Sequence, residues 1–158
     1  MKFSAQEEYG LRCLLRIAKF YKINKSLTIP EISQFEGITQ HNVAKLLRIL
    51  RLGGFLASER GQVGGYTLAK PPEQIIISGV LELLGGKLFE EEQFCGDHAG
   101  IPSICTHTVD CSVRSLWRVV QDSVDKVLKK TTLRDLLGSE QDLEFKISTI
   151  SSEYDNVS

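Results

Sequence analysis

Residues 28–54, TIPEISQFEGITQHNVAKLLRILRLGG, carry the signals for two helices joined by a tight turn. Thr28 and Glu31 form a capping-box pattern, which marks the start of a short helix. Gly37 follows that helix as a terminator, and Thr39 caps a longer helix that ends at the final glycine pair. The stretch therefore predicts a helix, a glycine-containing turn and a second helix, which is the order of a helix-turn-helix motif.

The longer helix is predicted to have one apolar face and one polar face. Its apolar residues recur at helical spacing, and polar or basic residues fill the positions between them. Gln and Asn side chains can recognise adenine, while Lys and Arg can recognise guanine or phosphate. A solvated surface gives the same pattern, but the preceding turn favours a DNA-recognition helix. The candidate DNA contacts on this helix are Gln40, His41, Asn42, Lys45 and Arg48.

Residues 1–70 are predicted to form a winged helix-turn-helix domain. A helix capped by Ser4 precedes the motif, and two short strands, at 55–60 and 66–69, follow it. The segment between the strands is rich in glycine, which suits a hairpin tip laid against a phosphate or the minor groove. The candidate DNA contacts at this tip are Arg60 and Gly61.

Charge is distributed unevenly along the 158 residues. Residues 1–70 hold eleven Lys or Arg and five Asp or Glu, a net charge of +6. Residues 71–158 hold eight Lys or Arg and fifteen Asp or Glu, a net charge of −7. A basic N-terminal half agrees with a domain that binds a polyanion. The sequence has no secretory signal and no run of about 18 apolar residues, so we expect a cytoplasmic protein with no membrane partner.

Three of the four cysteines and two of the three histidines lie close together, between residues 95 and 111. Thiolates crowded into a loop with Gly and Pro are the ligands that iron–sulfur clusters and zinc use. In a cytoplasmic protein such clustering favours metal binding or redox sensing over structural disulfides. The fourth cysteine, Cys13, is expected to be a small buried side chain. The candidate ligands are Cys95, Cys105 and Cys111, with His98 and His107 nearby.

The longest periodic segment follows the last cysteine, at about residues 111–131. Its apolar residues step by four and three, as they do along the seam of a coiled coil. Such a helix packs either on its own domain or against a second chain, and a small DNA-binding domain before it favours a twofold dimer. The candidate dimer contacts are Val113, Leu116, Trp117, Val120, Val124 and Val127.

The predicted fold class is mostly α with a small β-hairpin, namely a winged helix-turn-helix plus a long dimerisation helix. The winged domain covers residues 1–70. A second part, residues 71–138, holds the sensor loop at about 88–111 and the dimerisation helix at about 111–131. Residues 139–158 form a polar, acidic tail, and we expect part of this tail to be disordered.

Four sequence blocks precede the three-cysteine loop in a fixed order: MKFS at 1–4 with Tyr9, EGIT at 36–39, LLRILRLGGFL at 46–56 and SERGQVGGYTL at 58–68. The last block is the most specific. In this order, over roughly residues 1–138, the chain resembles the IscR/NsrR-like family of winged-helix iron–sulfur transcriptional regulators. The resemblance implies a homodimer that binds a pseudo-palindromic operator in double-stranded DNA. By position it also assigns the recognition-helix and wing residues given above.

The resemblance further implies an iron–sulfur cluster, [2Fe-2S] or [4Fe-4S], that can be absent from an apo form. Its ligands by position are Cys95, Cys105 and Cys111. IscR itself has a histidine three residues after the third cysteine, where this chain has Arg114. NsrR-like relatives complete the site with a carboxylate from the N-terminal region of the other subunit, and Glu8 occupies that position. Glu8 of the partner subunit is thus the leading fourth ligand, and the alternatives are His107 and His98.

The sequence therefore predicts a homodimeric DNA-binding regulator that senses redox state, nitric oxide or iron–sulfur status through a cysteine-ligated cluster. Two alternatives keep the winged domain and replace the cluster with a zinc site or with a cluster-free thiol–disulfide switch. A cysteine-dependent enzyme is the remote alternative. We expect no enzyme, because the chain lacks a phosphate-binding glycine motif and a pair of catalytic carboxylates.

Overall fold

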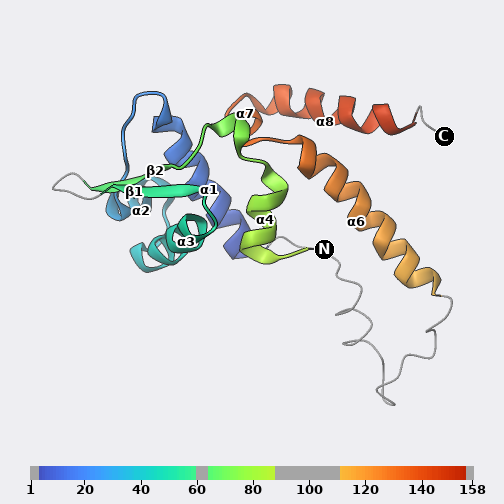
Figure 1. Ribbon diagram of the computed structural model, residues 1–158, viewed down its shortest axis with the longest axis horizontal. Helices are drawn as coiled ribbons and strands as arrows, with labels where there is room; N and C mark the ends of the chain where they lie inside the picture. The colour runs from blue at the N-terminus through green and yellow to red at the C-terminus, as the bar shows by residue number, and fades with distance from the viewer. Residues whose placement is uncertain (1–3, 60–63, 88–110, 156–158) are drawn as a thin grey trace, which may run out of the picture.

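The computed structural model describes residues 4–59, 64–87 and 111–155, which form helices around one two-stranded hairpin (Figure 1). The predicted fold class, mostly α with a small β-hairpin, is confirmed. Among the described residues, no helix is long and apolar enough to cross a membrane. In chain order the elements are α1 (Ala5–Tyr21), α2 (Ile29–Glu36), α3 (Gln40–Leu52), β1 (Leu56–Glu59), β2 (Gly65–Leu68), the 3-10 helix η1 (Pro72–Gln74), α4 (Ile77–Gly85), α6 (Ser112–Lys130), α7 (Leu133–Leu136) and α8 (Glu140–Asp155).

Local capping signals set the ends of the first helices. At α1, the Ser4 hydroxyl accepts a hydrogen bond from the backbone of Glu7, whose carboxylate accepts one from the backbone N–H of Ser4. Thr28 and Glu31 repeat this capping box at α2. Gly37 follows α2 with a φ of 66°, a left-handed conformation that glycine adopts without strain. The predicted helix-turn-helix boundaries therefore agree with the structure.

The hairpin is fixed to the start of α2 through backbone contacts. β1 and β2 are antiparallel, with Leu56 opposite Leu68. Leu27 forms a bridge with Tyr66 through two backbone hydrogen bonds of 3.0 and 2.8 Å. A side chain at Gly65 would bring its Cβ within 2.8 Å of the Leu27 carbonyl oxygen, so this approach requires glycine. The backbone itself therefore sets the distance between hairpin and helix-turn-helix.

One apolar core joins α1, α2, α3, the hairpin, α4 and α7. Each fully buried aliphatic side chain contributes about 1.5–3 kcal/mol to folding. Residues on both sides of position 70 contribute to this core, so α3 and α4 form parts of one packed body. The largest fully buried side chains are Leu14, Ile17, Leu27, Ile32, Leu47, Leu50, Ile75, Leu84 and Leu133.

The long helix α6 is fastened to this body at its C-terminal end. The Ile77 N–H donates to the Thr131 carbonyl at 2.9 Å, and the Leu133 N–H donates to the Ile75 carbonyl at 2.8 Å. These bonds join the end of α6 to the start of α4, against which α6 also packs. From this joint, the N-terminal end of α6 extends away from the body (Figure 1).

No helix is predicted in the polar tail, residues 139–158, whereas the structure has α8 at Glu140–Asp155. Ser139 and Asp142 exchange hydrogen bonds that cap its first turn. Leu143, Ile147 and Ile150 stand at i, i+4 and i+7, a short apolar stripe, and α8 packs against α6 and α7. The polar, acidic residues around this stripe gave the segment the composition of a disordered tail.

Candidate nucleic-acid interface and sensor site

The helix α3 presents its predicted polar face to solvent. Its apolar face is buried against α1, α2 and α4, which fixes the orientation of the helix. The opposite face remains open along the whole helix. The buried residues are Val43, Leu46, Leu47 and Leu50. The exposed residues are Gln40, His41, Asn42, Lys45 and Arg48.

The wing follows directly from α3. β1 ends at Glu59 and β2 begins at Gly65, so the tip lies between these positions. The two predicted tip contacts, Arg60 and Gly61, lie outside the described residues. The described part of the wing shows how the tip is carried: the strands pair with each other, and β2 also contacts α1.

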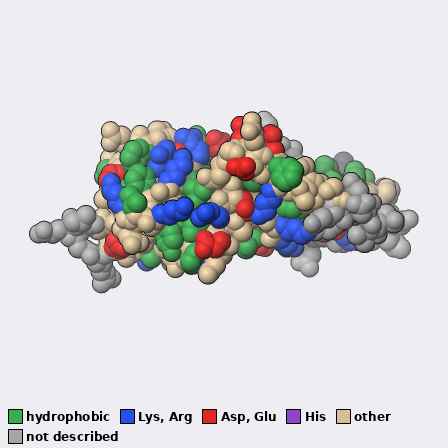
Figure 2. Space-filling model, turned by 90° about the horizontal axis from the view of Figure 1, so that it is seen from above, with side chains coloured by type: hydrophobic (Ala, Val, Ile, Leu, Met, Phe, Trp, Pro, Cys, Tyr) green, Lys and Arg blue, Asp and Glu red, His purple; other side chains and the backbone are tan. Residues whose placement is uncertain are grey.

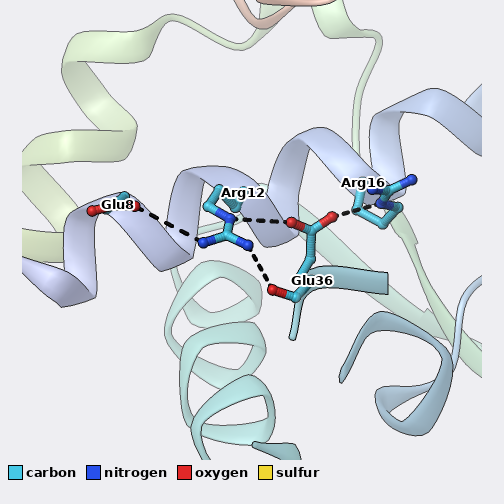
Figure 3. A network of polar contacts seen from close by, with 4 residues as sticks. All are labelled: Glu8, Arg12, Arg16 and Glu36. Atoms are coloured by element: carbon cyan, nitrogen blue, oxygen red, sulfur yellow. Dashed lines mark hydrogen bonds and ion pairs between the residues drawn. The ribbon is translucent and has the colours of Figure 1, made fainter. Parts of the chain in front are cut away.

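A charged cluster joins α1 to α2 at the turn of the motif. Glu36, at the end of α2, lies between Arg12 and Arg16 of α1 (Figure 3). Its carboxylate accepts from Arg16 Nε at 2.6 Å and from Arg12 Nε at 3.2 Å. Arg12 also donates to the Glu36 backbone carbonyl, which is otherwise an unpaired group at a helix end. The Glu36 side chain is only 9% exposed, so these contacts are stronger than ordinary surface ion pairs.

Glu8 forms the outer end of the same cluster. Its carboxylate oxygen lies 3.9 Å from Arg12 Nη1, and its side chain is 62% exposed. Arg12 therefore lies between an exposed carboxylate, Glu8, and the buried carboxylate of Glu36 (Figure 3). Sequence reasoning selected Glu8 but missed the cluster, whose only signal was the i, i+4 spacing of Arg12 and Arg16.

Cys111 occupies the N-cap position of α6. Its Sγ accepts a hydrogen bond from the backbone N–H of Arg114 at 3.3 Å, in the role that Ser or Thr usually has. Hydrogen bonds from backbone N–H groups to sulfur also tune iron–sulfur centres. The sulfur of the third predicted ligand therefore lies where the predicted sensor loop joins the long helix.

The described residues contain only two of the candidate cluster ligands. Cys111 is half-buried and Glu8 is exposed, so a sulfur and a carboxylate oxygen are both available as donors of the kinds that iron accepts. Within the described ranges, no group of three or more His, Cys, Asp or Glu side chains could hold a metal. The remaining candidates lie outside these ranges: Cys95, Cys105, His98 and His107.

Cys13 has a purely structural place in the core of α1. Its side chain is fully buried, which confirms the expectation from the sequence. Burial, together with a smaller effect of the nearby negative charge of Glu36, raises the pKa of the Cys13 thiol to about 12. The thiol therefore stays protonated at neutral pH and is a poor nucleophile.

The N-terminal half of α6 carries an uncovered apolar face. Val113, Leu116 and Trp117 are exposed, and even the large Trp117 side chain is 37% exposed. Further along the helix, Val120, Val124 and Val127 are partly covered. An exposed apolar stripe of this kind marks an interaction surface.

Together, the helix-turn-helix, the exposed polar face of α3 and the hairpin packed beside it define a winged helix-turn-helix DNA-binding protein. The model of the Rrf2 family, described as an iron-dependent transcriptional regulator, matches residues 3–139. The chain therefore belongs to the Rrf2 family of DNA-binding transcriptional regulators, which are not enzymes.

Relatives with known names agree with this assignment. The protein rrf2 of Nitratidesulfovibrio vulgaris is 30% identical over 141 residues, which cover 87% of each chain. CymR of Bacillus subtilis is 29% identical over 136 residues, or 86% of this chain and 89% of its own. IscR of Yersinia enterocolitica is 25% identical over 144 residues, or 91% of this chain and 84% of its own. The resemblance that the sequence suggested is thus confirmed at the level of the family.

Solved structures show the same fold. The structure of CymR, the global cysteine regulator of B. subtilis, matches with a TM-score of 0.69 at 27% identity, covering 87% of this chain and 96% of that one. The IscR of T. potens matches with a TM-score of 0.67 at 27% identity, covering 87% of this chain and 86% of that one.

Proposed function

We propose that this regulator is a homodimer that senses redox state, nitric oxide or iron–sulfur status through a cluster held by Cys95, Cys105 and Cys111. Glu8 of the partner subunit is the fourth ligand, in preference to His107 or His98. When bound, the cluster supplies an iron with one weakly held, exchangeable position. The observation that carries the proposal is the place of Cys111 at the N-cap of α6.

Cys111 connects ligand chemistry to the long helix through its own sulfur. Ligation or oxidation of that sulfur changes the hydrogen bond that it accepts from Arg114, and so changes the first turn of α6. At its other end, α6 is joined to α4 by the bond between Ile77 and Thr131. Because α4 packs against α3, a change at Cys111 can reach the recognition helix through contiguous packed elements.

The charged cluster of Arg12, Arg16 and Glu36 supports a second connection between the sensor site and the helix-turn-helix motif. Glu8 shares Arg12 with Glu36, which ends α2 and so begins the turn of the motif. If the Glu8 carboxylate binds the cluster of the other subunit, it no longer pairs with Arg12, and Glu36 becomes the single carboxylate partner of Arg12 within the charged cluster. The loss of this negative charge changes the electrostatic contacts that hold α2 against α1.

Homodimerisation is supported by the open apolar face of α6. A palindromic operator presents two equivalent half-sites, and twofold proteins bind both at once. Two copies of the stripe that contains Val113 and Trp117 can cover each other, which removes the exposed tryptophan from water.

An anaerobic absorption spectrum with iron and sulfide analysis tests the cluster. We expect visible absorption and stoichiometric iron and sulfide in the natural protein, and their loss in Cys111→Ala. Glu8→Ala should retain a cluster with a changed spectrum and faster loss in air, because one ligand is replaced by solvent. Glu73→Ala, which removes another exposed carboxylate, serves as the control and should match the natural protein.

The same measurement separates the two alternatives. A colourless protein with stoichiometric zinc would replace the cluster with a zinc site. A colourless, metal-free protein in which an oxidant reversibly changes both thiol content and DNA affinity would favour the thiol–disulfide switch.

A further inference from the structure

A small hollow of about 150 Å³ lies between the N-terminal turns of α1 and of α3. The two helices pack against each other, and the start of α1 lies beside α3 (Figure 1). The hollow is lined by Ala5, Gln6 and Tyr9 of α1 and by Asn42, Lys45 and Leu46 of α3. Because Asn42 and Lys45 belong to the exposed polar face of α3, the hollow borders the candidate DNA contacts of that helix.

The hollow lies along one edge of the polar face of α3. With 3.6 residues per turn, His41 and Arg48 lie along the middle of this face, opposite the buried side. Asn42 and Lys45, three residues apart, lie toward its edge, and this edge is the one that borders α1. When the middle of a recognition helix points at base edges in the major groove, its flanks approach the sugar–phosphate strands. The edge at α1 is therefore a place for a backbone contact.

Two polar groups at the hollow are available to a ligand. Within the described part of the chain, the Tyr9 hydroxyl and the Lys45 ammonium form no hydrogen bond or ion pair. The ring of Tyr9 is held in place, because it packs against the core and the Arg12 guanidinium lies 5.6 Å from its centroid. Gln6 is held as well, since its amide nitrogen donates to the Leu84 carbonyl. None of the described residues that line the hollow is acidic, so an anion meets no repulsion from its walls.

Volume and charge together limit what the hollow can hold. Sites for drug-sized ligands measure about 300–1,000 Å³, so a hollow of about 150 Å³ suits a single phosphate group. Positive charge alone would not locate such a site. Figure 2, which views the molecule from above Figure 1, shows Lys and Arg side chains on the face seen there, among hydrophobic and acidic ones. The hollow differs from a simple basic surface because it places a fixed hydroxyl beside an unpaired ammonium.

We propose that the hollow binds one phosphate group of the DNA backbone in each half-site, through the Tyr9 hydroxyl and the Lys45 ammonium. The hydroxyl donates a hydrogen bond to a phosphate oxygen, and the ammonium pairs with its charge. This inference rests on the DNA face assigned to α3 and adds α1 to that face. Since phosphates are the same in every sequence, the contact positions α3 in the groove and does not select bases.

Removal of one hydroxyl tests the proposal in the full chain. Tyr9→Phe keeps the ring that packs on the core, and Tyr21→Phe removes a hydroxyl from the other end of α1 as the control. On a duplex that the natural protein selects from a random pool, we expect the dissociation constant to rise by about three- to tenfold for Tyr9→Phe and by less than about 1.5-fold for Tyr21→Phe. Fluorescence anisotropy measures both constants.

Two further properties of the loss identify a phosphate contact. Tyr9→Phe should weaken binding to the selected duplex and to a duplex of unrelated sequence by the same factor. It should leave the salt slope unchanged, because a hydroxyl carries no charge, whereas Lys45→Ala should lower the slope by about one. Circular dichroism and thermal unfolding check that each variant keeps its helices.

A modified duplex locates the phosphate itself. Each duplex in a series carries an uncharged methylphosphonate in place of one backbone phosphate, at equivalent positions in the two half-sites. At one position the modification should weaken binding of the natural protein, and on that duplex the effect of Tyr9→Phe should disappear. Lys45→Ala should lose its effect at the same position, because both groups contact the same phosphate.

The outcomes separate this inference from the DNA face on which it rests. If Tyr9→Phe binds like Tyr21→Phe while Lys45→Ala binds more weakly, the phosphate site is overturned and the face of α3 stands. A loss limited to the selected duplex also overturns it, because Tyr9 would then contact a base edge. If Lys45→Ala and Arg48→Ala also bind like the natural protein, the DNA face is overturned as well. The cluster proposal is tested separately, by the absorption spectrum, which should be the same in Tyr9→Phe and in the natural protein.

Discussion

The two described cysteines differ in what surrounds each sulfur, although both are free of disulfides. Cys13 is fully buried and Cys111 caps α6 at half-buried exposure. With the metal removed and the fold intact, we expect iodoacetamide to modify Cys111 and to leave Cys13 unmodified, because thiolate is the reactive form and the pKa of Cys13 is about 12. Peptide mass mapping measures both. In guanidinium both should react, and fast modification of native Cys13 would contradict its burial.

Glu36 is the residue on which the charged cluster depends. Glu36→Ala leaves Arg12 and Arg16 facing each other without their shared carboxylate, so we expect a loss of about 1–3 kcal/mol in the free energy of unfolding. Urea denaturation measures this loss. The matched control is Glu73→Ala, an exposed carboxylate outside the cluster, which should change stability by less than about 0.5 kcal/mol. Equal urea midpoints for Glu36→Ala and Glu73→Ala would show that the charged cluster contributes nothing to the free energy of unfolding.

At the scale of elements, the junction of α7 and α8 should depend on pH. Burial alone would raise the pKa of Asp135, but hydrogen bonds from Lys146 and Thr132 outweigh it and hold that pKa below 3.8. A lowered pKa in the folded state gives stability that is present above the ordinary pKa and is lost as the pH falls below it. Asp135→Asn should therefore be less stable than the natural protein near pH 7, and the difference should shrink toward about pH 3.

Chemical denaturation at both pH values, followed by circular dichroism, measures that difference. The informative control is Asp122→Asn, which changes an exposed aspartate on α6. A stability difference for Asp135→Asn that does not change with pH would mean that the Lys146 ion pair and the capping box make no pH-dependent contribution.

The recognition helix gives a prediction for DNA binding. Lys45→Ala and Arg48→Ala should each weaken binding to a duplex that the natural protein selects from a random pool, and each should lower the salt slope by about one if it contacts phosphate. Lys19→Ala, an exposed lysine on α1, is the control for net charge. Fluorescence anisotropy across a salt series measures both quantities. If Lys45→Ala and Arg48→Ala bind DNA as tightly as Lys19→Ala, these side chains of α3 do not contact the DNA.

Elements with local signals could be predicted from the sequence. Ser4, Thr28 and Thr39 fixed helix starts, because a cap depends on residues only three positions apart. The contact of Glu36 with Arg12 joins positions 24 residues apart, and no local pattern encodes it. Helix α8 was missed for a different reason: its stripe gains stability only from packing on α6 and α7. The exposed polar face of α3 could be predicted from its helical spacing, whereas most of the predicted cysteine loop lies outside the described residues.

At the scale of the whole molecule, DNA affinity should depend on assembly. Val113→Asp places a charge in the exposed stripe of α6, and Ser115→Asp places it on another exposed position of the same helix. We expect the first variant to be monomeric and to lose about a hundredfold in operator affinity, because one chain binds only one half-site. Sedimentation and anisotropy measure the two effects. Full affinity from a monomeric variant would separate DNA binding from dimerisation.

The close approach of Gly65 to Leu27 bears on how this regulator can change its preferred sequence. Two main-chain hydrogen bonds and a missing Cβ hold the wing at a set distance from the start of α2, and the exposed side chains of α3 take no part in these bonds. The exposed side chains of α3 can therefore be exchanged without moving the frame that presents them. New operators are then within reach through single replacements on a fixed scaffold, whereas Gly65→Ala should alter the reading of every operator at once.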